Sequence, residues 1–302
     1  MNKRLLQFTL ALLMALGSHA ARATIKVLAC EPEWGALVQE LAGDKASVYV
    51  ATTGLQDPHH IQARPSLVAA ARTTDLLVCT GAELEVGWLP VLIRQSGNNA
   101  IQPGKAGNFA AADFVRKLEV PDRLDRADGD VHATGNPHIQ TDPRNIALVA
   151  GPLVQRLAEI DPTNAAVYQA RAADFMARWS AAVARWEKQA KALRGTPIVV
   201  QHKAFPYLEQ WLGLVQVAAL EPKPGIEPTS AHLSNVLAGL KARPAKMILR
   251  AAYNDGRGAE WLAERTQLPV VVLPFTVGGD EQAKDLFALF DDTIQRLLKA
   301  LP

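Results

Sequence analysis

Apolar runs rich in β-branched residues alternate with amphipathic stretches in two separate parts of the chain. The strand-like runs of the first part cover residues 25–30, 47–52, 75–80 and, weakly, 99–102, and those of the second part cover residues 197–202, 215–220, 245–251 and 269–275. Strands that alternate with helices are typical of β/α units with parallel sheets. We therefore predict an α/β fold of two β/α lobes, each built on a mainly parallel four-stranded sheet.

The segment between these parts has the strongest helical pattern in the sequence. Its apolar side chains recur every three or four residues: Ala165, Tyr168, Ala172, Phe175, Trp179, Val183, Trp186, Ala190 and Leu193. At about 1.5 Å per residue, a helix over this segment would be roughly 50 Å long, enough to run along both lobes. We predict a packing face on one linking backbone helix at 161–194, between an N-terminal lobe at 24–160 and a C-terminal lobe at 195–302.

The first 23 residues have the pattern of a secretory signal. Lys3 and Arg4 precede an apolar stretch at 5–17, which is too short to span a bilayer, and the small residues Ala21 and Ala23, one on each side of Arg22, offer a cleavage site. A buried first helix fits poorly because the apolar stretch has no polar face. A lipid anchor on Cys30 also fits poorly, since Lys26 interrupts the run that leads into it. We predict a soluble periplasmic protein with a cleaved signal at 1–23.

The net charge gives no electrostatic case for binding nucleic acid or an anionic membrane. Residues 1–23 contain three of the 32 basic residues and none of the 30 acidic ones, so the chain without them carries a net charge of −1. A nucleic-acid-binding domain is usually strongly basic. We expect no nucleic-acid partner, and we expect a monomer.

The sequence has two cysteines, and both close strand-like runs in the first part of the chain. Cys30 ends the first run and Cys79 lies near the end of the third. Adjacent parallel strands would bring these ends together, and an oxidising compartment would permit a bond between them. A Cys30–Cys79 disulfide and a pair of small buried apolar side chains are equally compatible with this pattern.

Three histidines stand beside a Pro or Gly turn or at the end of an apolar run. His59 follows an Asp-Pro turn, His138 follows Gly-Asn-Pro, and His202 ends the first strand-like run of the second part. Ligands of α/β folds bind at the carboxyl ends of the strands. Three imidazoles with a carboxylate or a water would complete the tetrahedron that Zn²⁺ prefers. A single histidine usually has a structural role, but three in similar contexts predict a metal site between the lobes.

At these elements the sequence resembles the metal-specific substrate-binding proteins of ABC importers, the cluster A-I or TroA-like family. The resemblance extends over essentially the whole chain after the signal. It is carried by DPHH at 57–60, NPHIQTDP at 136–143, HKAFPYL at 202–208 and GIEPTSAHL at 225–233. The resemblance implies two β/α lobes joined by one long helix, with Zn²⁺ or Mn²⁺ bound between them.

The resemblance also implies a set of metal ligands. These are His59 and His138 from the first lobe, His202 from the second, and a carboxylate in the loop after the last strand. Where that carboxylate is expected, this sequence has Thr276 or Val277, and Asp280 follows a few residues later. Asp280 is therefore either the fourth ligand or the N-cap of the final helix, in which case a water would complete the site.

Four further residues are assigned to the rim of the site or to contacts with the ligands. His60 neighbours His59, and Glu83 and Glu85 lie on the loop after the third strand, where carboxylates could hold the imidazoles. His132 lies in a loop that resembles a much reduced form of the acidic, histidine-rich loop of some zinc-type family members.

The combined prediction is a periplasmic protein that captures Zn²⁺, with Mn²⁺ as the second choice, and delivers it to an ABC permease in the inner membrane. Imidazole ligands favour zinc, whereas manganese prefers carboxylate oxygen. A zinc-dependent hydrolase is an alternative, but no motif supplies a dedicated general base. A haem-binding or siderophore-binding protein of the same two-lobe plan is a further alternative.

Overall fold

The computed structural model describes residues 24–123, 129 and 132–301. The predicted signal at 1–23 lies outside these described residues. Within them, no helix has both the length and the apolar character needed to cross a membrane.

The first lobe is built on a parallel sheet with the strand order β2-β1-β3-β4. Its strands are β1 (Ile25–Ala29), β2 (Ala46–Val50), β3 (Leu76–Cys79) and β4 (Asn108–Ala110). The strand predicted at 99–102 is wrong, because Asn99–Ile101 form a 3₁₀ turn. The Asn98 side chain caps this turn by accepting a hydrogen bond from the backbone N–H of Ala100, an interaction that favours a turn over a strand.

The second lobe repeats this plan with the strand order β6-β5-β7-β8, again all parallel. Its strands are β5 (Pro197–Val200), β6 (Val215–Ala219), β7 (Met247–Ala251) and β8 (Val270–Leu273). The prediction of two lobes with four-stranded parallel sheets is confirmed.

Helices cover both faces of each sheet. They are α2 (Pro32–Ala42), α3 (Pro65–Arg72), α4 (Leu89–Ser96), α5 (Pro143–Ile160), α6 (Ala165–Gln189), α7 (Pro206–Leu212), α8 (Ser230–Gly239), α9 (Arg257–Thr266) and α10 (Leu286–Lys299). Five of them have proline in the first turn, where its fixed φ suits a helix and its missing N–H has no partner to lose. Strand alternation sends Val27 and Ala29 into the core shared with α2, α5 and α6, and Leu28 into a separate core under α3 and α4.

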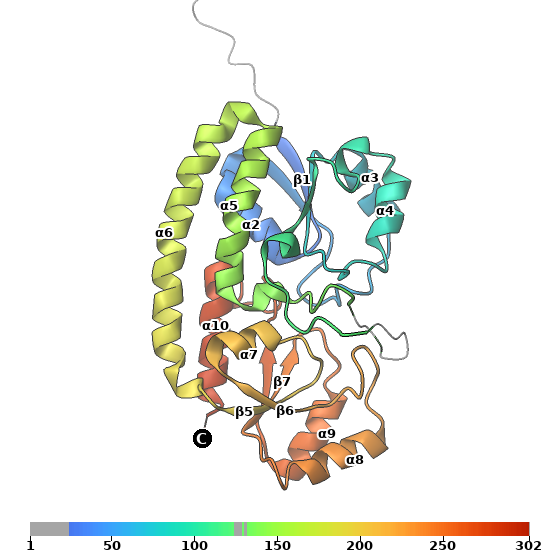
Figure 1. Cartoon of the computed structure of the whole chain (residues 1–302), viewed down its shortest axis with the longest axis vertical. Coiled ribbons are helices and arrows are strands. Elements are labelled where there is room, and N and C mark those ends of the chain that lie inside the picture. The colour runs from blue at the N-terminus through green and yellow to red at the C-terminus, as the bar shows by residue number, and fades with distance from the viewer. Residues whose placement is uncertain (1–23, 124–128, 130–131, 302) are drawn as a thin grey trace, which may run out of the picture.

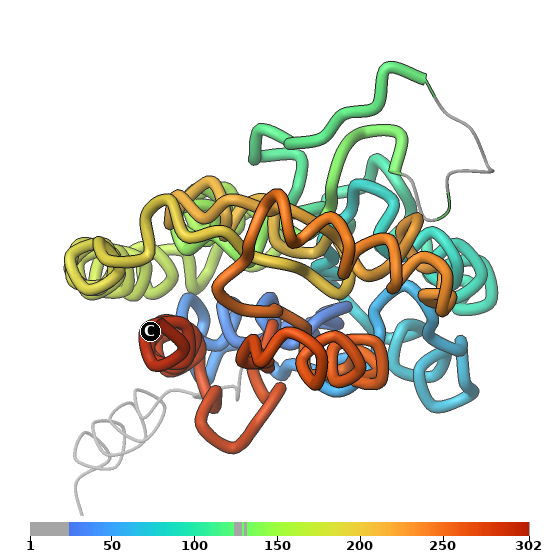
Figure 2. Tube along the Cα trace, turned by 90° about the horizontal axis from the view of Figure 1, so that it is seen from below, coloured from blue at the N-terminus to red at the C-terminus, as the bar shows by residue number. Residues whose placement is uncertain are grey.

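The long helix is present and runs along both lobes (Figure 1). Its α-helical part, α6, is flanked by 3₁₀ turns at Pro162–Asn164 and Ala190–Leu193. Trp179 and Trp186 are fully buried and contact the rings of Phe287 and Phe290 on α10. Figure 2 shows α10 beside α6 when the molecule is seen from below. The tryptophans therefore form a packing face, and a single apolar core includes strands of both sheets.

Two features fix the loops at the facing ends of the sheets. A disulfide joins Cys30 and Cys79, at the carboxyl ends of the paired strands β1 and β3. Across the lobes, Gly54 packs so closely on the 278–279 backbone that a Cβ on Gly54 would lie 2.3 Å from the Gly279 nitrogen. The loop that leads to His59 therefore contacts the loop that follows β8, and only glycine fits at position 54.

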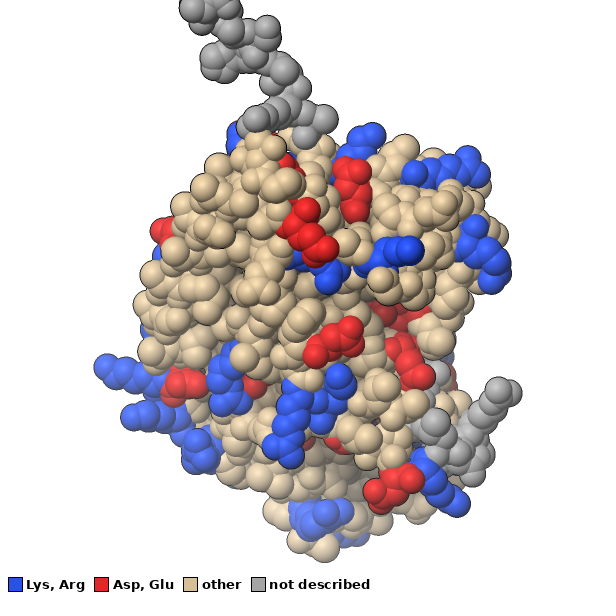
Figure 3. Space-filling view, turned by 45° about the horizontal axis from the view of Figure 1, so that its top comes forward, with Lys and Arg blue, Asp and Glu red and all other residues tan. Residues whose placement is uncertain are grey.

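Acidic and basic side chains are interspersed on the face of the molecule shown in Figure 3. No broad basic surface is visible on that face, in agreement with the near-neutral charge of the sequence.

Candidate metal centre

The three predicted histidines meet at one point between the lobes. His59 lies in the loop after β2, His138 directly precedes the 3₁₀ turn before α5, and His202 follows β5. One ligand atom from each lies within 4.8 Å of the other two. The ring centroids are 5.3 Å apart for His59 and His138, 5.9 Å for His59 and His202, and 5.6 Å for His138 and His202. All three side chains are buried.

Carboxylates hold two of these rings by their Nδ1 atoms. Asp57 Oδ1 lies 2.7 Å from His59 Nδ1, and Glu221 Oε2 lies 2.6 Å from His202 Nδ1. Glu221 Oε2 also accepts a hydrogen bond from the backbone N–H of Gly225. A carboxylate on Nδ1 fixes the tautomer and leaves Nε2 as the donor atom for a metal.

Two buried imidazole nitrogens of the cluster have no hydrogen-bond partner among the described residues. They are Nε2 of His59 and Nδ1 of His138. Buried polar atoms are nearly always paired, so an unpaired one indicates a ligand position. Burial, together with the charges of His59, His202 and His132, lowers the pKa of His138 well below its ordinary value. His138 is therefore neutral at neutral pH, as a metal ligand must be.

Sequence reasoning did not assign Asp57 and Glu221 to the site. Asp57 was interpreted only as part of a turn, although it lies two residues before His59. Glu221 follows β6, which pairs with β5, the strand that leads to His202. The end of a neighbouring parallel strand is the signal that could have identified it.

The structure does not bring Asp280 into the histidine cluster. The Asp280 carboxylate lies 2.6 Å from the Arg296 guanidinium and accepts hydrogen bonds from the N–H groups of Gln282 and Ala283. Asp280 is also not the N-cap of the final helix, because Asp285 caps α10. The Phe275 ring, 5.4 Å from the His138 ring, is the part of the loop after β8 that approaches the histidines.

Glu83 and Glu85 have different surroundings. Glu85 is not at the rim: it is 2% exposed and accepts hydrogen bonds from the N–H groups of Thr80 and Gly81 inside the first lobe. Glu83 accepts a hydrogen bond from the N–H of Ala133, next to His132. The His132 and His60 rings lie 5.4 and 6.2 Å from the His59 ring, and His60 is exposed.

Three glutamates are buried together behind the site, where the lobes meet. Glu31 and Glu85 both contact the Thr80 backbone, and Glu33 accepts a hydrogen bond from the Thr276 hydroxyl of the second lobe. Burial raises the pKa of Glu33 and that of Glu85 from 4.5 to about 7. Burial and the charges of Glu85 and Glu33 raise the pKa of Glu31 well above 4.5.

These raised pKa values predict that the three glutamates contribute less to stability as the pH rises. At these groups the folded state holds protons that the unfolded chain releases, so their contribution is greatest below about pH 4.5 and decreases as the pH passes through 7. Glu31→Gln should remove part of this dependence, because its amide can donate to Glu85 without a proton. We expect the variant to be more stable than the original protein by about 1–3 kcal/mol at pH 8 and nearly equal at pH 4.5. Urea unfolding at both pH values measures this, and an equal effect at both would contradict it.

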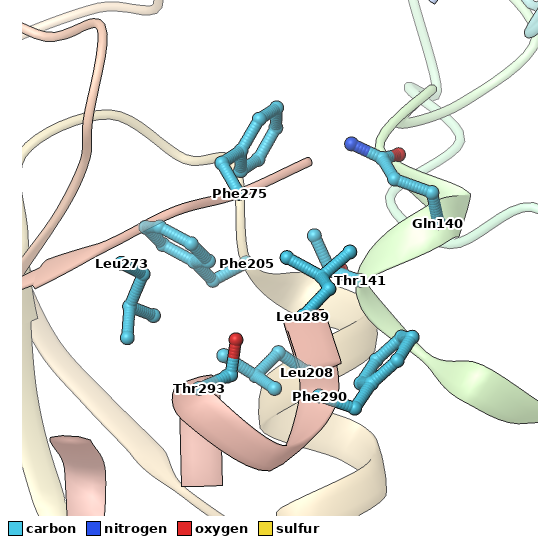
Figure 4. Close-up of a pocket in the computed structure, with 9 residues that line it drawn as sticks. All are labelled: Gln140, Thr141, Phe205, Leu208, Leu273, Phe275, Leu289, Phe290 and Thr293. Carbon is cyan, nitrogen blue, oxygen red and sulfur yellow. The ribbon is translucent and has the colours of Figure 1, made fainter. Parts of the chain in front are cut away.

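A small apolar cavity lies between α7, α10 and the 3₁₀ turn after His138. Gln140 and Thr141 reach it from the first lobe, and phenyl and aliphatic side chains such as Phe205 and Phe275 line the rest (Figure 4). Its volume is about 20 Å³, which is room for about one water molecule. This cavity is far too small for haem or a siderophore.

Comparison with known proteins gives one family. Residues 27–300 match the family model described as ZnuA, zinc-uptake complex component A, periplasmic. The high-affinity zinc uptake system protein ZnuA of Paracoccus denitrificans is 28% identical over 261 residues, which is 74% of this chain and 76% of the relative. The manganese ABC transporter substrate-binding lipoprotein PsaA of Streptococcus pneumoniae is 22% identical over 266 residues, 86% of this chain and 83% of the relative.

Solved structures show the same fold. A crystal structure of ZnuA superposes with a TM-score of 0.77 at 21% identity and covers 93% of this chain and 100% of its own. A manganese-bound periplasmic metal-binding protein from Candidatus Liberibacter asiaticus superposes with a TM-score of 0.74 at 18% identity, covering 92% of this chain and 100% of its own. The architecture is thus shared by a structure of ZnuA and by a protein that was solved with manganese bound.

Proposed function

Because the chain belongs to the ZnuA family of periplasmic zinc-uptake components, we propose that it captures Zn²⁺ between its lobes and delivers it to an ABC permease of the inner membrane. As a member of this family it is a metal-binding transport protein and not an enzyme, so the hydrolase alternative is wrong. We further propose that it works in the periplasm as a monomer, after removal of residues 1–23.

The observation that carries the proposal is the convergence of three buried imidazoles with two unpaired nitrogens, contributed by both lobes. We propose His59, His138 and His202 as the ligands. Asp57 and Glu221 hold two of the rings in place. Three ligand atoms that lie within 4.8 Å of one another suit a single ion and not a haem or a siderophore, which need a broad aromatic or basic pocket.

The preference for zinc over manganese rests on the chemistry of the donor atoms. Neutral imidazole nitrogen suits Zn²⁺, whereas Mn²⁺ is better served by carboxylate and water oxygen. Asp57 and Glu221 bind the outer nitrogens of the rings, so their carboxylates act on the imidazoles and not directly on the ion.

We expect Zn²⁺ to bind at least about 10³-fold more tightly than Mn²⁺, in line with the order of divalent-metal affinities at nitrogen sites. Competition with a chromophoric chelator gives the zinc affinity, and the paramagnetic resonance signal of free Mn²⁺ gives the manganese affinity. Affinities within tenfold of each other would contradict the zinc assignment. Delivery is tested by deleting the gene, which should impair growth when zinc is chelated and should be corrected by added Zn²⁺ and not by Mn²⁺.

A further inference from the structure

We propose that Phe275 determines the preference of the site for zinc over manganese. Its ring lies against that of His138 and forms an apolar surface that keeps water and carboxylate oxygens away from the bound ion. This inference rests on the proposed function, because it concerns selectivity at the same site. The basis is steric: Mn²⁺ favours an octahedral set of oxygen ligands, whereas Zn²⁺ is satisfied by four ligands that include imidazole nitrogen.

The Phe275 ring belongs to the second lobe but contacts a proposed ligand from the first. Phe275 follows β8, its ring centroid lies 5.4 Å from that of His138, and the two ring planes make an angle of 71°. Both side chains are buried. The rings of Phe205 and Tyr253 lie 5.9 and 5.3 Å from that of Phe275. An ion held by His138 therefore has a packed aromatic group, and not open solvent, beside one of its ligands.

The backbone at Phe275 has an unfavourable conformation. Its φ is 70°, in the left-handed region that bulky side chains rarely adopt. Such conformations persist only where the surrounding structure holds them, and they are concentrated at functional sites. The strained backbone therefore supports a function for the ring at this position beyond filling the core.

Contacts with the first lobe hold the residues that follow Phe275. The Thr276 hydroxyl donates a hydrogen bond to the buried carboxylate of Glu33 on α2. The Thr276 carbonyl accepts a hydrogen bond from the Gly279 N–H, and the Gly279 backbone is the part of the loop on which Gly54 packs. The loop is thus fixed to the first lobe directly beside Phe275. Thr276 is a positioning residue in this proposal and Phe275 is the residue that acts on the ion's surroundings.

Carboxylate oxygens lie close to this ring. Glu31 and Glu33 line a cavity of about 10 Å³ together with Phe275 and with Pro58, the residue before His59. Oε1 of Glu31 has no hydrogen-bond partner among the described residues, and the cavity has room for about one water molecule. Phe275 thus borders both a source of oxygen ligands and the histidine cluster. Removal of the ring would open a path for a carboxylate or a water to the ion.

The test compares Phe275→Ala with Phe205→Ala. Phe205 is the matched control because it is buried in the same aromatic group, and its ring contacts that of Phe275. In the described part of the chain, the ring of Phe205 makes no contact with a histidine ring, whereas that of Phe275 does. We expect Phe275→Ala to lower the ratio of Zn²⁺ affinity to Mn²⁺ affinity at least about tenfold, and Phe205→Ala to change it less than about threefold. Chelator competition and the resonance signal of free Mn²⁺ give the two affinities.

Bound Co²⁺ gives a second readout, which a purely structural role of the ring would not change. Co²⁺ with four ligands absorbs visible light much more strongly than Co²⁺ with six, so the spectrum reports the coordination geometry. At saturation the Co²⁺ complex of Phe275→Ala should absorb more weakly than that of the original protein, and Phe205→Ala should keep the original spectrum. Thr276→Val removes the hydrogen bond to Glu33 and keeps the ring, so it should change both readouts in the same direction by a smaller amount.

The outcomes separate this inference from the proposed function. An unchanged affinity ratio or an unchanged Co²⁺ spectrum in Phe275→Ala overturns the inference, and so does an equal change in Phe205→Ala. The proposed function survives these results if His138→Ala still loses zinc. If Phe275→Ala does not fold, Phe275→Leu is compared with Phe205→Leu, and the same differences are expected at a smaller size. If the original protein binds neither Zn²⁺ nor Co²⁺, or binds Mn²⁺ as tightly as Zn²⁺, the proposed function fails and this inference fails with it.

Discussion

Replacing His138 by alanine is expected to lower the zinc affinity by at least about 10³-fold, equivalent to about 4 kcal/mol of binding free energy. His138 is 1% exposed, and its lowered pKa keeps it neutral and ready to bind metal. Its Nδ1 has no partner in the described part of the protein. Removal of this ring takes away one of the three ligand atoms that lie within 4.8 Å of one another.

The metal-free variant should keep its fold and most of its stability. A buried nitrogen without a hydrogen bond is itself destabilising, so its removal offsets part of the packing that is lost. Chelator competition gives the affinity, and unfolding in the presence of EDTA gives the stability. His60→Ala is the control and should keep near-normal affinity. If His138→Ala binds zinc as tightly as the original protein, the proposed site is wrong. If His138→Ala does not fold in the absence of metal, the affinity should be measured with His138→Asn instead.

Saturating Zn²⁺ is expected to raise the unfolding temperature by about 10 °C. A ligand that binds only the folded state at 1,000 times its dissociation constant stabilises it by about 4 kcal/mol, and each kcal/mol shifts a protein of this size by about 2–4 °C. The ligands come from both lobes, so an unfolding event that separates His202 from His59 must release the ion. The stabilisation should therefore apply to the whole molecule.

Scanning calorimetry with increasing free Zn²⁺ measures this shift. Equal concentrations of Mn²⁺ should have a much smaller effect, and His138→Ala should show almost no zinc-dependent shift. A shift of the same size in His138→Ala would mean that zinc stabilises the protein from another site.

Most of the fold was predictable because its signals are local. Alternation of apolar runs and amphipathic stretches identified seven of the eight strands and the long helix. The exception, β4, has only the residues Asn108–Ala110, which are too few to form a pattern. The weak strand-like run at 99–102 precedes β4, and its first residues form a turn that the Asn98 side chain caps. This short strand is defined by its pairing with β3. The sequence alone does not reveal that pairing.

The three central histidines were predictable because each follows a turn or a strand end. Their surroundings were not, because they depend on contacts between distant residues. Asp280 is paired with Arg296 on α10, and Glu85 turns into the first lobe toward Thr80 and Gly81 instead of toward the histidines. No local spacing distinguishes these arrangements from a metal ligand or a rim carboxylate.

The long helix α6 has a consequence for how the protein unfolds. Its buried side chains belong to one apolar core that includes β1 of the first sheet and β7 of the second, so neither half can expose its part of this core without exposing the other's. The two lobes should therefore melt in a single cooperative transition, and each half of the chain made alone should lack a complete interior. Cooperativity of this kind would let one captured ion protect the entire chain from proteolysis, including helices remote from the histidines.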